Sequence, residues 1–244
     1  MQLDYPDHYA GITSNRFQKN SAFEQGFKAG GSLLVQGALV LGRYGCSVSK
    51  ASYDPSVEID TAEEQEEVLQ KWAGENGCWY SYPKKYYSDQ GFKFYGFGGE
   101  ASVYTEGDDY VHKVCRIGQY DSLVHFFDRI VIQNAICPEA KLVVEGFGRD
   151  ADEFAVMFKQ KFFRQENELM SLDEISSYME NLGFWKDDSA PYGFGVYYSD
   201  SVIAEDIHQR NIWKTSNSNV VIVDGVFRFN TPWLGKNGKY VFGW

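Results

Sequence analysis

Alternation of hydrophobic and polar positions is clearest after about residue 91, whereas the first 55 residues are rich in Gly, Ser and Asn and show few regular periods. Two later stretches have the strand pattern. Phe92–Arg116 predicts two strands that turn at Glu106–Asp109. Lys141–Phe163 predicts a second hairpin that turns at Gly148–Asp152.

Three stretches have helical spacing of their apolar residues. They are 56–77, 121–135 and 171–183. In the first, the N-cap is Asp60 or Thr61 and the end is Gly74 or Gly77. In the third, Ser171 precedes Glu174 by three positions, which predicts a capping box.

Short apolar runs follow the third helix, at Gly193–Tyr198, Ser201–Asp206 and Asn219–Asn230. The predicted order is therefore hairpin, helix, hairpin, helix and then short strand pairs. This order indicates an α+β fold with an antiparallel sheet first.

Composition narrows the classes of function. With 244 residues, 43% of them hydrophobic, the chain can bury one sizeable core. The net charge of −11 opposes a large nucleic-acid footprint but allows a small phosphorylated ligand. The apolar run Gly30–Gly45 is too short to span a membrane. Four scattered cysteines and a start without a secretory signal favour a reduced, cytoplasmic protein.

Glycines lie between two predicted strands at Gly96, Gly98 and Gly99, with Val103 after them. Glycine lets main-chain N–H groups approach phosphate oxygens without a Cβ atom in the way. The alternative is an ordinary hairpin turn.

Lys113 lies ten residues after Val103, on the returning strand, between Val111 and Val114. If it faces the core, its ammonium group needs an anion, because an unpaired buried charge is costly. The alternative is an exposed lysine on an edge strand.

A polar loop interrupts the apolar runs near the C-terminal end. Asp206 and Asn211 are five residues apart, so that a carboxylate and an amide share one loop. The carboxylate can orient a hydroxyl or accept its proton, and the amide can hold a metal ion. Asp224 ends the next apolar run before a glycine, where it can coordinate Mg²⁺ or form a turn.

In this order, the four motifs resemble the protein-kinase-like superfamily over about residues 91–230. The segments "EDIHQRN" and "VVIVDG" are similar to those of aminoglycoside phosphotransferase-like kinases. They are still more similar to the small kinase domains in polyvalent proteins of bacteriophages and mobile elements.

The resemblance implies a two-lobed kinase-like fold, with ATP and Mg²⁺ as cofactors. Asp206 would be the catalytic base, and Asn211 and Asp224 would bind Mg²⁺. His208 would lie near the transferred phosphate or brace the loop. The nucleotide would be held by the glycines, Val103 and Lys113, and the adenine by the hinge after the second hairpin, Phe158, Lys159, Gln160 and Lys161.

The sequence departs from the family pattern at several positions. The helix over 121–135 contains no Glu to pair with Lys113, so Asp128, or Asp121, is the expected partner. Ala101 replaces the third glycine of the nucleotide loop. Only twenty residues follow Asp224, which predicts a minimal C-terminal lobe.

The expected organisation has four parts: an accessory region (1–57), a helical lead-in (58–90), an N-lobe (91–161) and a minimal C-lobe (162–244). The expected function is transfer of the γ-phosphate of ATP to a hydroxyl of a protein or a small molecule. The alternatives are a kinase-shaped binding module without catalysis and an enzyme that transfers AMP. No nucleic-acid or membrane partner is expected.

Overall fold

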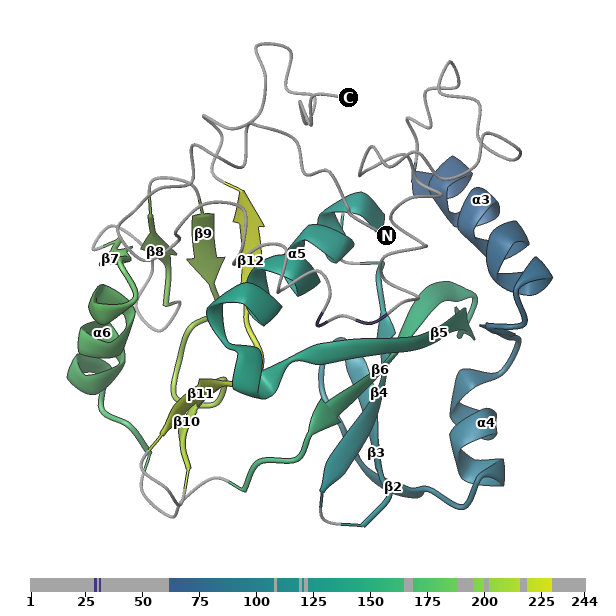
Figure 1. The fold of residues 1–244 in the computed structure, drawn as a ribbon, viewed down its shortest axis with the longest axis horizontal. Helices are drawn as coiled ribbons and strands as arrows, with labels where there is room; N and C mark the ends of the chain where they lie inside the picture. The colour runs from purple at the N-terminus through teal and green to yellow at the C-terminus, as the bar shows by residue number, and fades with distance from the viewer. Residues whose placement is uncertain are drawn as a thin grey trace. The chain divides into compact units, whose positions relative to one another are not determined.

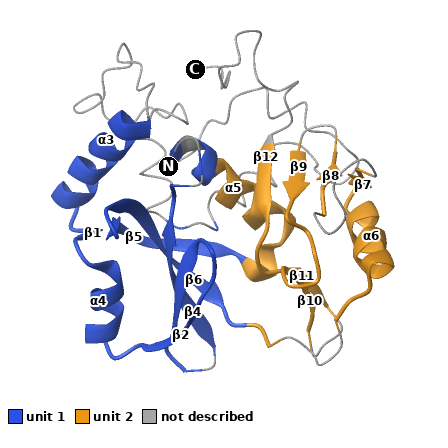
Figure 2. Ribbon diagram, turned by 180° about the vertical axis from the view of Figure 1, so that it is seen from behind, with its two compact units in different colours: residues 1–4, 27–127, 141–162 blue, residues 5–26, 128–140, 163–244 orange. Residues whose placement is uncertain are grey.

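The computed structural model describes residues 62–107, 109–118, 120, 123–164, 169–187, 195–199, 202–215 and 219–229, together with Ala29 and Gly31. Apart from those two residues, the expected accessory region lies outside this part of the chain. The chain forms two compact units (Figure 2), namely 1–4, 27–127 and 141–162, and 5–26, 128–140 and 163–244.

The first unit is built on a six-stranded sheet with the order β1-β5-β6-β4-β3-β2 (Figure 1). Its pairs are antiparallel except for β1 and β5, which are parallel. The elements in chain order are α3 (Ala62–Glu75), β1 (Trp79–Tyr80), α4 (Pro83–Asp89), β2 (Lys93–Phe97), β3 (Ala101–Thr105), β4 (Tyr110–Arg116), β5 (Leu142–Asp150) and β6 (Glu153–Lys161).

Helix α4 covers one face of this sheet. It begins at Pro83, whose ring favours the first helical position because no hydrogen bond is lost there. Tyr87 of α4 is 1% exposed and packs against Tyr104 of β3. Val114, Ala155 and Met157 complete the same buried cluster.

Helix α5 (Leu123–Ile136) begins in the first unit and ends in the second. Within the first unit, Phe126 packs against Phe158 of β6, and Phe127 packs against Phe147 of β5. Strand alternation places Phe158 on the face opposite Met157 and therefore opposite α4. The first turns of α5 thus lie on the second face of the sheet.

The second unit contains the rest of α5, a 3₁₀ turn, one helix and short strands. The turn is η2 (Pro138–Ala140), and the remaining elements are α6 (Leu172–Asn181), β7 (Trp185–Lys186), β8 (Tyr197–Tyr198), β9 (Val202–Glu205), β10 (Ile212–Lys214), β11 (Val220–Ile222) and β12 (Val226–Phe229). One sheet has the order β12-β9-β8-β7, and β10 and β11 form a separate hairpin.

The predicted α+β class and most elements are confirmed. The capping box at Ser171 and Glu174 is present. The first predicted pair of strands is three strands, because residues 98–100 separate β2 from β3. The second hairpin turns at Ala151 and Asp152, which both have positive φ, so Gly148 lies inside β5. The candidate N-caps Asp60 and Thr61 lie outside the described residues.

The lead-in expected over 58–90 provides two helices and a strand that joins the sheet. The predicted two-lobed arrangement stays a prediction. Within the described part of the chain, none of the helices has the length and apolar character needed to cross a membrane.

Candidate active site

Lys113 lies on β4, on the face of the sheet opposite α4. Its neighbour His112 packs against Tyr87 of α4, and successive strand residues point to opposite faces. Lys113 pairs in register with Val103 of β3 on one side and with Phe158 of β6 on the other. The first unit therefore places the candidate lysine and Val103 side by side on one face.

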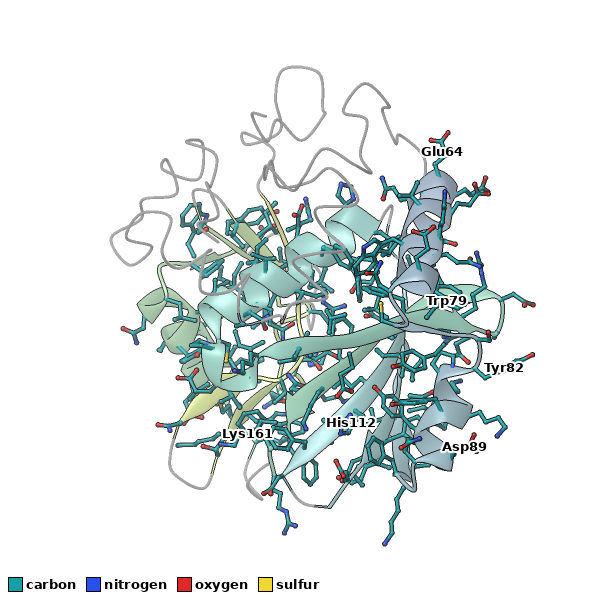
Figure 3. All side chains as sticks on the ribbon, turned by 45° about the vertical axis from the view of Figure 1, so that its right-hand side comes forward. Glu64, Trp79, Tyr82, Asp89, His112 and Lys161 are labelled. Carbon is teal, nitrogen blue, oxygen red and sulfur yellow. The ribbon has the colours of Figure 1, made fainter. Side chains whose placement is uncertain are left out.

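A partly buried hydrogen-bond network, which includes His112 (labelled in Figure 3), lies on the α4 side of this strand. His112 is 2% exposed, and its Nδ1 lies 2.7 Å from Oε2 of Glu145. The hydroxyl of Tyr87 donates to the same oxygen at 2.8 Å. Burial raises the pKa of Glu145, but the bonds from His112 and Tyr87 outweigh it, so the pKa lies below its usual value. The network braces the strand that carries Lys113.

The glycine-rich segment joins β2 to β3. Gly96 follows a β-bulge in β2, and Gly98 and Gly99 form the turn with Glu100. A Cβ atom added to any of the three glycines would meet nothing within 4 Å, and none of them has a positive φ. Within the part of the chain that the structure describes, neither packing nor backbone conformation requires glycine here. The three positions therefore leave room for a ligand to approach the main chain.

Asp206 follows β9 and adopts a left-handed backbone conformation, with φ of 60°. Such a conformation is uncommon in residues other than glycine and is concentrated at functional sites. The side-chain amide of Asn211 holds Asp206 in place. Its Nδ2 donates to the main-chain oxygen of Asp206 at 2.9 Å and to its carboxylate Oδ2 at 2.7 Å.

His208 binds the other oxygen of the Asp206 carboxylate. Its Nε2 lies 3.0 Å from Oδ1, and its Nδ1 accepts a hydrogen bond from the main-chain N–H of Arg210 at 3.1 Å. Because Nδ1 accepts, the proton of the neutral ring is on Nε2 and is donated to Asp206. His208 thus braces the carboxylate, which is one of the two roles considered for it.

The hairpin of β10 and β11 brings Asp224 next to the loop. Ile212 pairs with Ile222, so the residues that flank the hairpin lie together at its open end. The main-chain oxygen of Asn211 accepts hydrogen bonds from the N–H of Val223 at 2.9 Å and of Asp224 at 3.4 Å. The second unit therefore gathers Asp206, His208, Asn211 and Asp224 at one place.

Two residues that support this site were not identified from the sequence. The main-chain oxygen of Gly195 accepts a hydrogen bond from the N–H of Ile207 at 3.0 Å. A Cβ atom on Gly195 would overlap the main-chain oxygen of Ile207. Because glycines are frequent in this chain, nothing in the sequence distinguishes Gly195 from the others.

The second is Arg129 of α5, whose guanidinium binds Asp224 and Gly225. A signal for it existed, because Arg129 is the only basic residue other than histidine in the apolar helix LVHFFDRIVIQNAI. A charge in such a helix requires a specific partner. The preceding residue, Asp128, is 2% exposed. Its pairing with Lys113 stays a prediction, and Asp121 lies outside the described residues.

The residues expected to form the hinge do not follow the second hairpin. Phe158, Lys159, Gln160 and Lys161 lie within β6 rather than after it. Phe158, Lys159 and Gln160 pair with β4 on one side and with β5 on the other. The sheet uses main-chain groups of Phe158, Lys159 and Gln160 on both sides, whereas Lys161 pairs with β4 alone. An adenine contact at Lys161 stays a prediction. The apolar run Phe154–Phe158 is followed by three polar residues, so the local pattern does not indicate that the strand continues to Lys161.

The donor atoms fit Mg²⁺, which prefers carboxylate and amide oxygens. Asn211 turns its nitrogen toward Asp206, and its side-chain oxygen has no hydrogen-bond partner among the described residues. Over the described ranges, no cluster of three or more His, Cys, Asp and Glu side chains is arranged to hold a metal ion. Two oxygen donors, on Asn211 and Asp224, would suit an ion that nucleotide phosphates also bind.

A glycine-rich strand turn, a strand lysine and an Asp–Asn loop beside an Asp-Gly turn define a kinase-like domain. The sequence profile of a family described as serine/threonine/tyrosine kinases found in polyvalent proteins matches residues 62–231. The chain belongs to this family. No curated protein and no solved structure matches the chain.

Proposed function

We propose that this domain transfers the γ-phosphoryl group of ATP to a hydroxyl group of a protein or small-molecule acceptor, with Mg²⁺ as cofactor. The observation that carries the proposal is the arrangement of Asp206, Asn211 and Asp224. A carboxylate with a constrained backbone lies beside two oxygen donors suited to a metal ion. Phosphoryl transfer consists mainly of positioning and charge neutralisation, which such a set provides.

In the proposed reaction, the acceptor hydroxyl approaches the carboxylate of Asp206. A bond forms between the acceptor oxygen and the γ-phosphorus, the bond from that phosphorus to the β–γ bridging oxygen breaks, and the hydroxyl proton passes to Asp206. His208 and Asn211 each bind one oxygen of this carboxylate and keep it oriented. Asp224 and Asn211 would hold Mg²⁺, which would supply charge neutralisation at the phosphates.

The first unit provides the proposed nucleotide contacts. Lys113 binds the α- and β-phosphates, and the main chain of Gly96, Gly98 and Gly99 covers them. Support comes from the register of Lys113 with Val103, which places both on the face that α4 leaves uncovered. It also comes from glycines that nothing within the chain requires.

Labelled ATP tests this function and separates it from the two alternatives. We expect label from γ-labelled ATP, but not from α-labelled ATP, to reach an acceptor or the protein itself. Transfer of α-label would indicate AMP transfer instead. Binding of nucleotide without any transfer, to protein or to water, would indicate a binding module.

Lys113→Met and Asp206→Asn provide the matched variants. The first removes the proposed phosphate contact, and the second removes the proposed base while keeping a similar shape. Lys186→Met serves as the control, because Lys186 is an exposed lysine on β7. Both test variants should lose transfer, and the control should keep it. Equal transfer in all three would contradict the proposed site.

A further inference from the structure

Arg129 is a buried arginine with a two-point contact to the Asp-Gly turn. It is 7% exposed, whereas the side chain of Asp224 is 52% exposed. The guanidinium Nη2 donates to Oδ1 of Asp224 at 2.5 Å, and Nε donates to the main-chain oxygen of Gly225 at 2.8 Å. The contact joins a cation in the interior to a carboxylate that reaches solvent.

Oδ1 of Asp224 has a second donor. The main-chain N–H of Gly225 also donates to Oδ1, at 3.1 Å. A carboxylate oxygen has two lone pairs, so these two bonds use its capacity. A metal ion that used this oxygen would have to displace one of the two donors.

The residue that directly follows α5 holds the adjacent strand at a second point. The main-chain N–H of Ile222, at the end of β11, donates to Sγ of Cys137 at 3.4 Å. Cys137 comes directly after Ile136, the last residue of α5, and eight residues after Arg129. The Asp-Gly turn is therefore held against α5, and Asp224 cannot move away from Arg129 without breaking these contacts.

From these contacts we infer that Arg129 is an internal counter-ion that competes with the divalent cation for Asp224. The inference rests on the proposed role of Asp224 as a metal ligand. A guanidinium stays charged at every physiological pH, so its repulsion of a bound cation is permanent. The phosphates of a nucleotide supply the negative charge that offsets this repulsion. The metal ion therefore binds well together with ATP and poorly alone.

The test measures binding of Mn²⁺ alone, and of Mn²⁺ with ADP, to the full chain by calorimetry. Arg129→Met keeps the apolar stem and removes the charge. We expect it to bind Mn²⁺ alone about tenfold more tightly than the wild type, because one nearby positive charge is removed. The affinity for Mn²⁺ with ADP should change much less. A role confined to packing would not produce this difference between the two ligands.

Three further variants separate the effect of charge from that of geometry. Arg129→Lys keeps the charge but loses the fork that reaches both Asp224 and Gly225, so its Mn²⁺ affinity should stay near that of the wild type. Lys186→Met removes one positive charge from an exposed position of the same unit and should have no effect. If Arg129→Met does not unfold cooperatively, Arg129→Gln takes its place. This variant also removes the charge and should also bind Mn²⁺ more tightly than the wild type.

Asp224→Asn distinguishes failure of this inference from failure of the proposed function. If Asp224→Asn weakens Mn²⁺ binding but the folded Arg129→Met and Arg129→Gln variants match the wild type, the counter-ion role is overturned alone. If Asp224→Asn binds Mn²⁺ as the wild type does, Asp224 is not the ligand. That result overturns the metal site and the counter-ion together.

Discussion

Gly195 lies directly against Ile207, the residue that follows Asp206. Its main-chain oxygen accepts the N–H of Ile207, and a Cβ atom at this position would overlap the main-chain oxygen of Ile207. Because the obstructing atom belongs to the backbone, a rotamer change cannot relieve the overlap. The loop that carries Asp206 and His208 therefore depends on a glycine eleven residues before Asp206.

The first prediction concerns this contact. Gly195→Ala should lower the free energy of unfolding by about 3 kcal/mol, since the chain has to move to accept the methyl group. Urea unfolding measures the change. Gly74→Ala is the matched control, because Gly74 lies in α3 and an added Cβ atom meets nothing within 4 Å. It should stabilise the domain slightly, since alanine favours the helix. Equal stability of the two variants would contradict the close contact.

Substitutions in the glycine-rich segment should weaken nucleotide binding and leave stability nearly unchanged. Gly98→Ala and Gly99→Ala should change the free energy of unfolding by no more than about 0.5 kcal/mol, because the added atoms meet open space. Each should nevertheless weaken ATP binding by about tenfold, the cost of one hydrogen bond to a charged group. Calorimetric titration with ATP and Mg²⁺ measures this. Unchanged affinity in both variants would remove this segment from the nucleotide site.

Asp206 provides the third prediction. Asp206→Asn should lower the turnover of ATP by about 10²–10⁴, as expected for loss of a general base. Asparagine tolerates the left-handed conformation, so the thermal unfolding transition should stay close to that of the wild type. Release of phosphate from ATP measures turnover without a known acceptor. Near-normal turnover in the folded variant would exclude Asp206 from this role.

The network of His112, Glu145 and Tyr87 predicts a pH dependence of stability. The pKa of Glu145 is lowered in the folded protein, so the unfolded chain binds its proton more readily. Its stabilising contribution is therefore complete above the reference pKa of 4.5 and is lost as the pH falls through the lower folded value.

Urea unfolding between pH 3 and pH 7 checks this contribution. Glu145→Gln should be less stable than the wild type by about 1–2 kcal/mol at pH 7, and the difference should shrink toward pH 3. Tyr87→Phe removes one donor and keeps the carboxylate, so it should retain most of the pH dependence. A difference between Glu145→Gln and the wild type that stayed constant with pH would exclude Glu145 as the titrating group.

The sequence alone determined the features that depend on near neighbours. The capping box at Ser171 needs a partner only three residues away, and strands and helices follow from alternation and helical spacing. The pairing of Asp206 with Asn211 was also accessible, because both lie in one loop of six residues. The family likewise follows from motifs in a fixed order.

Only the tertiary structure decided the features that join distant segments. The contact of Arg129 with Asp224 spans 95 positions, and the hydrogen bond from Ile207 to Gly195 runs between segments on either side of β8 and β9. The pairing of Phe158, Lys159 and Gln160 with both β4 and β5 was likewise visible only in the folded sheet. The local pattern indicates which residues prefer a strand or a helix. It does not indicate which partner a buried charge contacts or how closely two main-chain segments approach, because only folding of the chain brings those atoms together.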